Sequence, residues 1–104
     1  MNLMKHNQLL KLGQNLLEAP WPKCDQIARQ IYEIGGEEAK NALLEGLKGK
    51  NHHIRLASIK MLTKFHDASL AGYIRPFLDD PLYETRMQAK KSLEVLTKEE
   101  VSVG

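Results

Sequence analysis

The stretch FLDDPLYETRMQAKKSLEVL, residues 77–96, decides the fold, because an earlier part of the chain repeats its pattern. Within it, TRMQAKKSL (85–93) aligns with IRLASIKML (54–62) at a shift of 31 residues. The shift superposes three pairs of residues: Arg55 and Arg86, Ser58 and Ala89, Leu62 and Leu93. An arginine, a small residue and a leucine at the same spacing in both segments indicate an internal repeat.

The repeat extends to the segments on either side of this helix. A shift of 30 residues places Ala28 under Ser58. A shift of 31 residues superposes three apolar residues on three later ones: Ala39, Leu43 and Leu47 on Leu70, Ile74 and Leu78. A pair of helices in each period is typical of a solenoid, in which neighbouring units bury each other's apolar faces. The small residues at 28, 58 and 89 are expected to let adjacent helices approach closely.

Apolar residues recur at helical spacing along the chain, and strand-like alternation does not occur. This pattern predicts an all-α protein of about six helices. Turn-forming residues separate them at 19–22, 35–36, 49–51, 66–67 and 79–81. Pro76 lies inside the helix expected over 69–79 and should kink it, because proline lacks the backbone N–H that continues a helix. The alternative to a solenoid is a compact helical bundle of different topology.

An arginine, a small residue and a leucine on one helix, followed by a turn and a second helix ending in Asp79-Asp80-Pro81, resemble the HEAT-like repeats. The similarity is to the short variety, with about 30 residues per unit. It implies a short right-handed α-solenoid of antiparallel helix hairpins. The single domain 1–104 would then consist of an N-terminal capping helix (1–19) and units 22–50, 51–81 and 82–98, the last one partial.

The resemblance also implies a structural ladder of Arg55, Arg86 and Asp80 that ties one unit to the next. We expect Asp80 to pair with Arg86. The preceding unit has Gly49-Lys50 in place of the acidic turn, which should leave Arg55 freer. Repeats of this kind serve many unrelated roles, including DNA binding on a basic face, so the fold by itself does not assign a function.

Composition excludes several classes of protein. The 104 residues carry a net charge of +2, which by itself indicates neither nucleic acid nor a membrane as partner. A single cysteine, Cys24, excludes an internal disulfide and favours a reducing compartment, so we expect a cytoplasmic location. The first residues show no leader pattern, and no stretch approaches the roughly 20 apolar residues of a membrane helix.

The sequence shows no arrangement typical of catalysis or metal binding. The four histidines lack the spacing of a zinc site, and Cys24 lies on an apolar stripe with no second cysteine. The carboxylate pairs occur at expected helix ends or in the tail, where capping explains them. Similar short repeats occur in lyases that attach bilin chromophores, but no catalytic set is evident here. We therefore expect neither enzymatic activity nor a cofactor.

The leading hypothesis is a protein-binding module that acts as an adaptor, scaffold or inhibitor. Its binding face should be the inner face, formed by the second helix of each unit (38–48 and 69–79). The candidate partner contacts are of mixed charge and include two aromatic residues in turns: Lys40, Glu45, Lys48, Arg75, Trp21 and Tyr83. A monomer or a weak homodimer is expected, because charged residues dilute the outer face of the last helix.

The alternative is a nucleic-acid-binding module. The window 48–64 contains no acidic residue and carries five candidate phosphate contacts: Lys48, Lys50, Arg55, Lys60 and Lys64. Lys60 and Lys64 are one helical turn apart and therefore share a face. A solvated helix face explains the same pattern without a ligand, so the alternative depends on whether these cations lie together.

Overall fold

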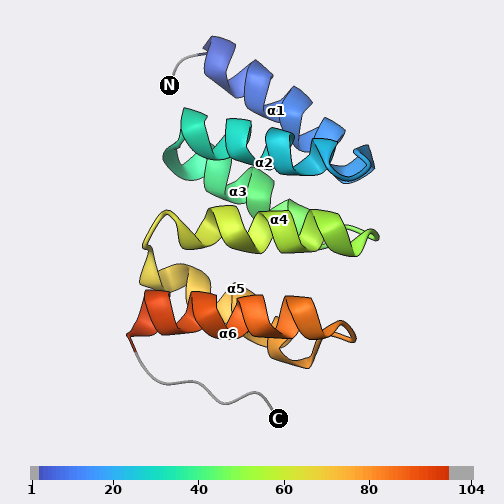
Figure 1. Ribbon diagram of the computed structural model, residues 1–104. Coiled ribbons are helices and arrows are strands. Elements are labelled where there is room, and N and C mark those ends of the chain that lie inside the picture. Colours follow the sequence, from blue (N-terminus) through green and yellow to red (C-terminus); the bar gives the residue numbers. More distant parts are fainter. Residues whose placement is uncertain (1–2, 99–104) are drawn as a thin grey trace.

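The computed structural model describes residues 3–98, and within that range the chain is helical and contains no strand (Figure 1). The elements in chain order are α1 (Leu3–Glu18), α2 (Lys23–Ile34), α3 (Gly36–Gly46), α4 (His52–Thr63), the 3₁₀ segment η1 (Ala68–Leu70), α5 (Ala71–Ile74), the 3₁₀ segment η2 (Arg75–Asp79) and α6 (Tyr83–Thr97). The expected all-α class is therefore confirmed, as is the number of helices within the described residues.

The helices are stacked along the long axis of the molecule. The molecule extends 42 × 27 × 16 Å along its three principal axes. Helices α2, α4 and α6 lie side by side, and α4 contacts both of the others (Figure 1). Helix α3 packs against α2 and α4, and α5 with η2 packs against α6. Helix α1 lies at one end of the stack, where it contacts both α2 and α3.

The turn between α2 and α3 depends on two glycines. Gly35 and Gly36 have φ angles of +76° and +84°, in the left-handed region that side chains with a Cβ rarely adopt. The Gly35 backbone N–H donates to the carbonyl of Ile31 at 3.3 Å and closes α2. Glu37 and Glu38 follow in the first turn of α3, where the helix dipole favours negative charge.

One continuous apolar core joins the helices. Its fully buried large side chains come from each helix in turn: Leu16, Ile31, Leu43, Ile59, Leu62, Ile74 and Leu93. Burial of each such side chain stabilises the fold by about 1.5–3 kcal/mol relative to exposure. The three small residues of the repeat, Ala28, Ser58 and Ala89, have no exposed surface, as expected.

The close approach of α3 to α4 shows why a small residue is needed at position 58. A Cβ built on Gly46 would overlap the Ser58 Oγ and lie 3.0 Å from the Leu16 Cδ2. Only glycine on one helix and a small residue on the other allow this spacing. The Ser58 hydroxyl donates to the Ile54 carbonyl at 2.8 Å, so it is satisfied although it is buried.

The segment 68–79 differs from the single kinked helix that its apolar spacing predicts. The structure divides it into η1, the four-residue α5 and η2. The change to 3₁₀ geometry occurs at Arg75, and Pro76 occupies the first turn of η2. Proline cannot donate to the carbonyl one turn earlier and tolerates the start of a helical segment, so it breaks α5 rather than bending it.

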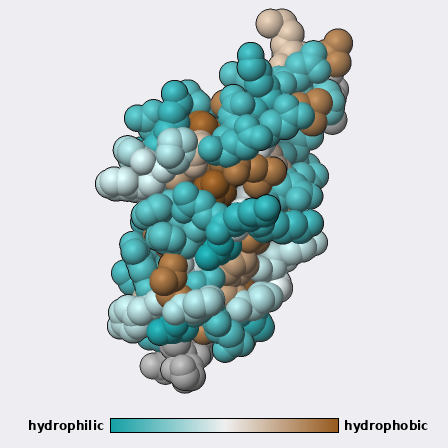
Figure 2. Space-filling model, turned by 90° about the vertical axis from the view of Figure 1, so that its right-hand side faces the viewer, coloured by the Kyte–Doolittle hydropathy of each residue, from teal (hydrophilic) through white to brown (hydrophobic). Residues whose placement is uncertain are grey.

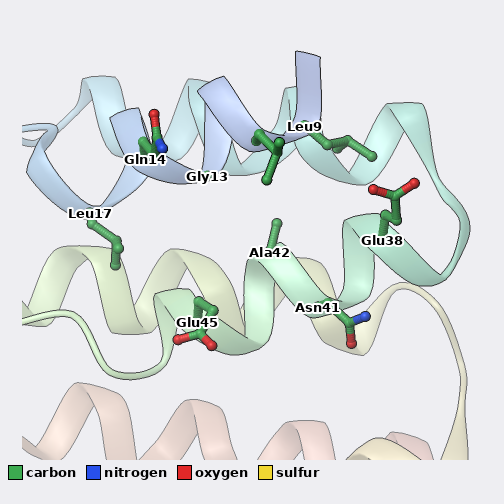
Figure 3. Close-up of a pocket in the computed structure, with 9 residues that line it drawn as sticks. Leu9, Gly13, Gln14, Leu17, Glu38, Asn41, Ala42 and Glu45 are labelled. Atoms are coloured by element: carbon green, nitrogen blue, oxygen red, sulfur yellow. The ribbon is translucent and has the colours of Figure 1, made fainter. Parts of the chain in front are cut away.

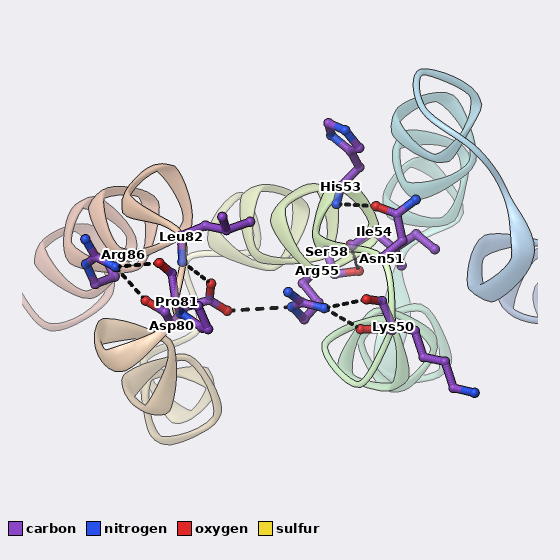
Figure 4. A network of polar contacts seen from close by, with 11 residues as sticks. Lys50, Asn51, His53, Ile54, Arg55, Ser58, Asp80, Pro81, Leu82 and Arg86 are labelled. Atoms are coloured by element: carbon purple, nitrogen blue, oxygen red, sulfur yellow. Dashed lines mark hydrogen bonds and ion pairs between the residues drawn. The ribbon is translucent and has the colours of Figure 1, made fainter.

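Two arginines at equivalent repeat positions make equivalent contacts with the turns that precede their helices (Figure 4). The Arg55 Nη1 donates to the carbonyls of Gly49 and Lys50 at 2.8 and 3.0 Å. The Arg86 Nη1 donates to the carbonyls of Asp80 and Pro81 at the same two distances. Each arginine therefore closes the turn that precedes its own helix, through main-chain oxygens.

The Asp80 carboxylate joins the turn before α6 to α4, and its side-chain partner is not the arginine that the sequence predicts. Its Oδ2 lies 3.6 Å from the Nε of Arg55, and its Oδ1 accepts from the Leu82 backbone N–H at 2.9 Å (Figure 4). The expected side-chain pair of Asp80 with Arg86 is wrong, and Arg55 is not free. The Arg86 guanidinium binds the main-chain carbonyls of Asp80 and Pro81, whereas α4, which packs against α6, places Arg55 next to the carboxylate.

Lys40 forms a second tie between consecutive parts of the stack. Its Nζ lies 2.9 Å from the Asp67 Oδ2 and 3.2 Å from the Glu37 Oε1. The Asp67 Oδ1 accepts from the backbone N–H and the hydroxyl of Ser69 at 3.0 and 2.7 Å. The Ser69 hydroxyl and then the Lys40 ammonium lower the pKa of the Asp67 carboxyl to about 2. The carboxylates of Asp67 and Glu37 raise the pKa of Lys40.

Candidate functional site

A groove of about 350 Å³ lies between α1 and α3, and we refer to it as the α1–α3 groove (Figure 3). Its α1 wall consists mainly of leucines, Leu9, Leu10 and Leu17, together with Gly13 and Gln14. Its α3 wall consists of Glu38, Asn41, Ala42 and Glu45. Figure 2 shows apolar surface and a hollow below the top of the molecule, which is the end occupied by α1 in Figure 1.

The position of α1 explains why the groove exists. Leu9 and Leu16 are buried and hold α1 on the core. Gly13 lies opposite Ala42, and a Cβ built on it would be 3.6 Å from the Ala42 Cβ. Gly13 and Ala42 are both small, so little side-chain volume fills the space beside the point where α1 crosses α3. The floor of the groove therefore remains open.

Two leucines on α1 remain exposed along the groove. Leu10 is 53% exposed and Leu17 is 44% exposed, whereas Leu9 and Leu16, one residue before each, are buried. Leu10 and Leu17 are seven residues apart, so they lie on the same face of α1 at a separation of about 10.5 Å. We call this pair the leucine row. An ordered apolar row beside a groove is typical of a surface that a partner covers.

The opposite wall repeats the same spacing with acidic residues. Glu38 and Glu45 are also seven residues apart and lie on one face of α3; we call them the glutamate row. Ring nitrogen Nδ1 of His6 hydrogen-bonds to the Glu38 carboxylate and joins α1 to α3. Glu45 is paired with exposed Lys48, at 3.4 Å. Within the described part of the chain, no basic residue lines the groove.

The predicted partner contacts are distributed over the molecule, and Glu45 is the one that lines the groove. Lys40 forms ion pairs with Asp67 and Glu37, and its side chain is only 18% exposed. Its role is therefore structural. Arg75 is exposed on η2. Trp21 and Tyr83 are exposed as expected.

The two aromatic residues lie in different parts of the stack: Trp21 is in the turn before α2, as expected, but Tyr83 is the first residue of α6 and not a turn residue. Trp21 stacks on the ring of His53 at 5.5 Å, and the Arg86 guanidinium lies 5.7 Å from the Tyr83 ring. The α1–α2 turn and the turn before α6 lie at the same edge of the stack, at the right in Figure 1, with the α3–α4 turn between them. Neither Trp21 nor Tyr83 lines the α1–α3 groove, whereas Glu45 does.

The five cations of the basic window do not form one patch. Lys48 pairs with Glu45, and Arg55 is held by Asp80 and two carbonyls. Lys64 lies beyond the C-terminal end of α4, about 18 Å along the helix from its start, with its Nζ 5.8 Å from the Tyr32 ring centroid. Lys50 points away from Arg55 in its turn, and Lys60 is exposed on α4 (Figure 4).

The thiol of Cys24 lies outside the α1–α3 groove. Cys24 has no exposed surface, and burial, followed by the charge of Asp25, raises the pKa of its thiol. A buried thiol with a raised pKa is a poor nucleophile at neutral pH. Among residues 3–98 no group of three histidine, cysteine, aspartate or glutamate side chains could hold a metal ion. No helix in that range is long and apolar enough to span a bilayer.

Sequence reasoning assigned α1 only a capping role and missed the leucine row. The signal was present, because α1 has leucines at 9, 10, 12, 16 and 17, which make its apolar stripe wider than one packing face requires. The period of 3.6 residues places Leu9, Leu12 and Leu16 on one face, but it does not say which edge of a wide stripe stays open. That choice depends on where α3 lies.

Comparison with known proteins leaves the interpretation to the geometry of this chain. No protein-family model, curated protein or solved structure matches it. The α1–α3 groove is therefore the candidate site on its own structural evidence, namely exposed leucines on one wall and carboxylates on the other.

Proposed function

We propose that the chain is a non-catalytic protein–protein interaction module, an adaptor, scaffold or inhibitor, that binds its partner in the α1–α3 groove. The observation that carries this proposal is the exposure of the leucine row, Leu10 and Leu17, beside the open apolar floor of the groove. When a partner removes such exposed leucines from water, their burial stabilises the complex by roughly 25 cal/mol per Å² of apolar surface.

The architecture that supports this function is a short right-handed α-solenoid of antiparallel hairpins, of the HEAT-like kind. Its support is the equivalent contacts of Arg55 and Arg86 with their turns, and the side-by-side packing of α2, α4 and α6. In such a stack α1 closes one end and lies beside α3, so the groove between them is open to a partner. We place the module in the cytoplasm, because its single cysteine forms no internal disulfide. We expect a monomer or a weak homodimer, because charged residues dilute the outer face of α6.

A pull-down from lysate of the source cells tests the proposed function. The wild-type chain is compared with the double variant Leu10→Ser/Leu17→Ser, in the presence and absence of nuclease. Tyr73→Ser is the matched control, because Tyr73 is 57% exposed on α5, outside the groove. A protein that is retained after nuclease treatment, lost with the double variant and kept by the control is the expected result. Equal retention by all three chains would contradict it.

Nucleic-acid binding is the second candidate, and Lys60 and Lys64 are the observation that favours it. Both are exposed and lie about one helical turn apart, Lys60 in the last turn of α4 and Lys64 directly after its end, and the window around them contains no acidic residue. Phosphate binding should weaken steeply with added salt and disappear in Lys60→Ala/Lys64→Ala. Salt-independent binding, or binding that is unchanged in this double variant, would reject that site.

A further inference from the structure

We propose that the occupant of the α1–α3 groove is a basic amphipathic helix of a partner protein. The inference rests on the proposed function and specifies the chemistry of the partner. It is carried by two rows of equal spacing that face each other across the groove, the leucine row (Leu10 and Leu17) on α1 and the glutamate row (Glu38 and Glu45) on α3.

The spacing of the rows selects a helix. In each row the two residues are seven positions apart, which corresponds to two helical turns and about 10.5 Å. A helix lying along the groove presents its own side chains at the same interval, so apolar residues at i and i+7 can meet both leucines at once. Side chains on one face of an extended peptide repeat at about 6.6–6.8 Å and do not match this interval.

The charge of the walls selects a basic helix. Glu38 and Glu45 are the charged residues among those that line the groove, and both are carboxylates. The contact of His6 with Glu38 uses Oε2 and leaves the second oxygen able to accept from a partner. Glu45 is 62% exposed, and its contact with Lys48 is between two exposed side chains, which a partner cation can replace readily. A helix with acidic flanks would meet like charges at both positions.

The leucine row continues beyond the groove. Leu3 lies seven residues before Leu10 on the same face of α1 and is 69% exposed. A bound helix of about three heptads could therefore contact Leu3, Leu10 and Leu17 in succession. Gly13 and Ala42 are in close approach at the centre, and the groove beside them, with a volume of about 350 Å³, can take an apolar side chain of the partner.

Two synthetic helical peptides provide the test. Both are about three heptads long and carry leucines at heptad positions a and d; one has lysines and the other glutamates on the flanks. Binding to the full chain is measured by fluorescence anisotropy at low ionic strength, and the site is mapped by amide chemical shifts. We expect the lysine peptide to bind at least about tenfold more tightly than the glutamate peptide and to shift residues of α1 and α3.

Three variants separate charge from apolar contact. Glu45→Lys leaves the His6–Glu38 contact in place and should reduce the preference for the lysine peptide, and Glu38→Lys/Glu45→Lys should reverse it. Leu10→Ser/Leu17→Ser should abolish binding of both peptides. Tyr73→Ser, on exposed α5 surface outside the groove, is the control that should change nothing.

Other results would overturn the inference in distinguishable ways. Equal binding of both peptides, lost in Leu10→Ser/Leu17→Ser, would keep the groove as a protein-binding site and refute the preference for a basic helix. A wild-type dimer in sedimentation equilibrium that this double variant dissociates would show that a second copy covers the groove. If neither peptide binds a monomeric chain, the helix proposal fails, and the pull-down alone then decides whether the proposed function stands.

Discussion

At the scale of single residues, the positions that matter most are those where a polar group is buried. Ser58, Thr85 and Ser92 have no exposed surface, and Asp80 is 8% exposed. The hydroxyl of Ser58 donates to a main-chain carbonyl, and that of Ser92 lies 2.6 Å from the Thr63 hydroxyl. The Thr85 hydroxyl has no hydrogen-bond partner among the described residues. A buried polar atom without a partner destabilises the folded state.

Thr85→Val should therefore stabilise the protein. Valine has nearly the same shape as threonine and removes the unsatisfied hydroxyl, and the equivalent repeat position is occupied by apolar Ile54. We expect the free energy of unfolding to rise by about 1 kcal/mol, measured by urea denaturation followed by circular dichroism. A decrease would show that the hydroxyl has a partner in solution. Thr97→Val, on the same helix, is the contrast and should lower the free energy of unfolding, because the Thr97 hydroxyl donates to the Leu93 carbonyl at 2.7 Å.

At the scale of secondary-structure elements, charged side chains join successive helices. The Asp80 carboxylate contacts Arg55 on α4 and the Leu82 backbone N–H that leads into α6, and the Lys40 ammonium joins α3 to the start of η1. Each tie connects parts of the chain that are distant in sequence. These contacts set the position of one helical layer on the next, which apolar packing alone leaves adjustable.

Asp80→Ala should lower the free energy of unfolding by about 2 kcal/mol, because it removes both the acceptor for Leu82 and the partner of partly buried Arg55. Asp80→Asn retains an oxygen for Leu82 and should have a smaller effect. A double-mutant cycle with Arg55→Met, measured by urea denaturation, isolates the pair. If Asp80→Asn is equally destabilising with and without Arg55, the two side chains do not interact.

The Lys40–Asp67 tie should make stability depend on pH at both extremes. The pKa of Asp67 is lowered to about 2 from a usual value of 3.8, so its contribution is present above 3.8 and is lost as the pH falls towards 2. The raised pKa of Lys40 gives the opposite sign, so its contribution is present below 10.5 and is lost as the pH rises through the raised value.

Urea midpoints of the wild type and Asp67→Asn test this dependence. The wild type should be the more stable at about pH 6, and the difference should shrink between about pH 4 and pH 2, where the wild-type carboxylate becomes protonated. Asp79→Asn, which removes an exposed carboxylate at the end of η2, is the matched control. A difference that stays constant across this acid range would contradict the linkage.

At the scale of the whole molecule, α1 has two roles that different leucines perform. Leu16 has no exposed surface and reaches the contact between α3 and α4 beside Gly46, whereas Leu10 and Leu17 face solvent in the groove. One set of side chains therefore closes the core of the stack, and the other set is available for a partner.

Leu16→Ala should lower the free energy of unfolding by about 2–5 kcal/mol, because it leaves a cavity where three helices meet. Leu10→Ser/Leu17→Ser should change it by less than about 1 kcal/mol, because both side chains are already exposed. Urea denaturation of both variants provides the comparison. A large loss of stability in the serine variant would show that the leucine row packs within the protein rather than serving a partner.

The sequence by itself determined the helical class, most helix ends and the internal repeat. The signals are local: the 3.6-residue spacing of apolar residues, Gly35-Gly36 in left-handed geometry, and small residues at 28, 58 and 89. It also placed Arg55 and Arg86 at equivalent positions, and the structure shows that they make equivalent contacts. These features depend on a few neighbouring residues or on a constant period, so a single chain displays them.

Tertiary structure alone decided the partner of Asp80 and the α1–α3 groove. Asp80 pairs with Arg55 rather than Arg86 because the stacking of α6 on α4 determines which guanidinium lies in front of the carboxylate. The groove is open because α1 buries its leucines at 9 and 16 and meets α3 at two small residues, Gly13 and Ala42. Such features depend on the relative position of helices, and the spacing of residues along one helix does not specify that position.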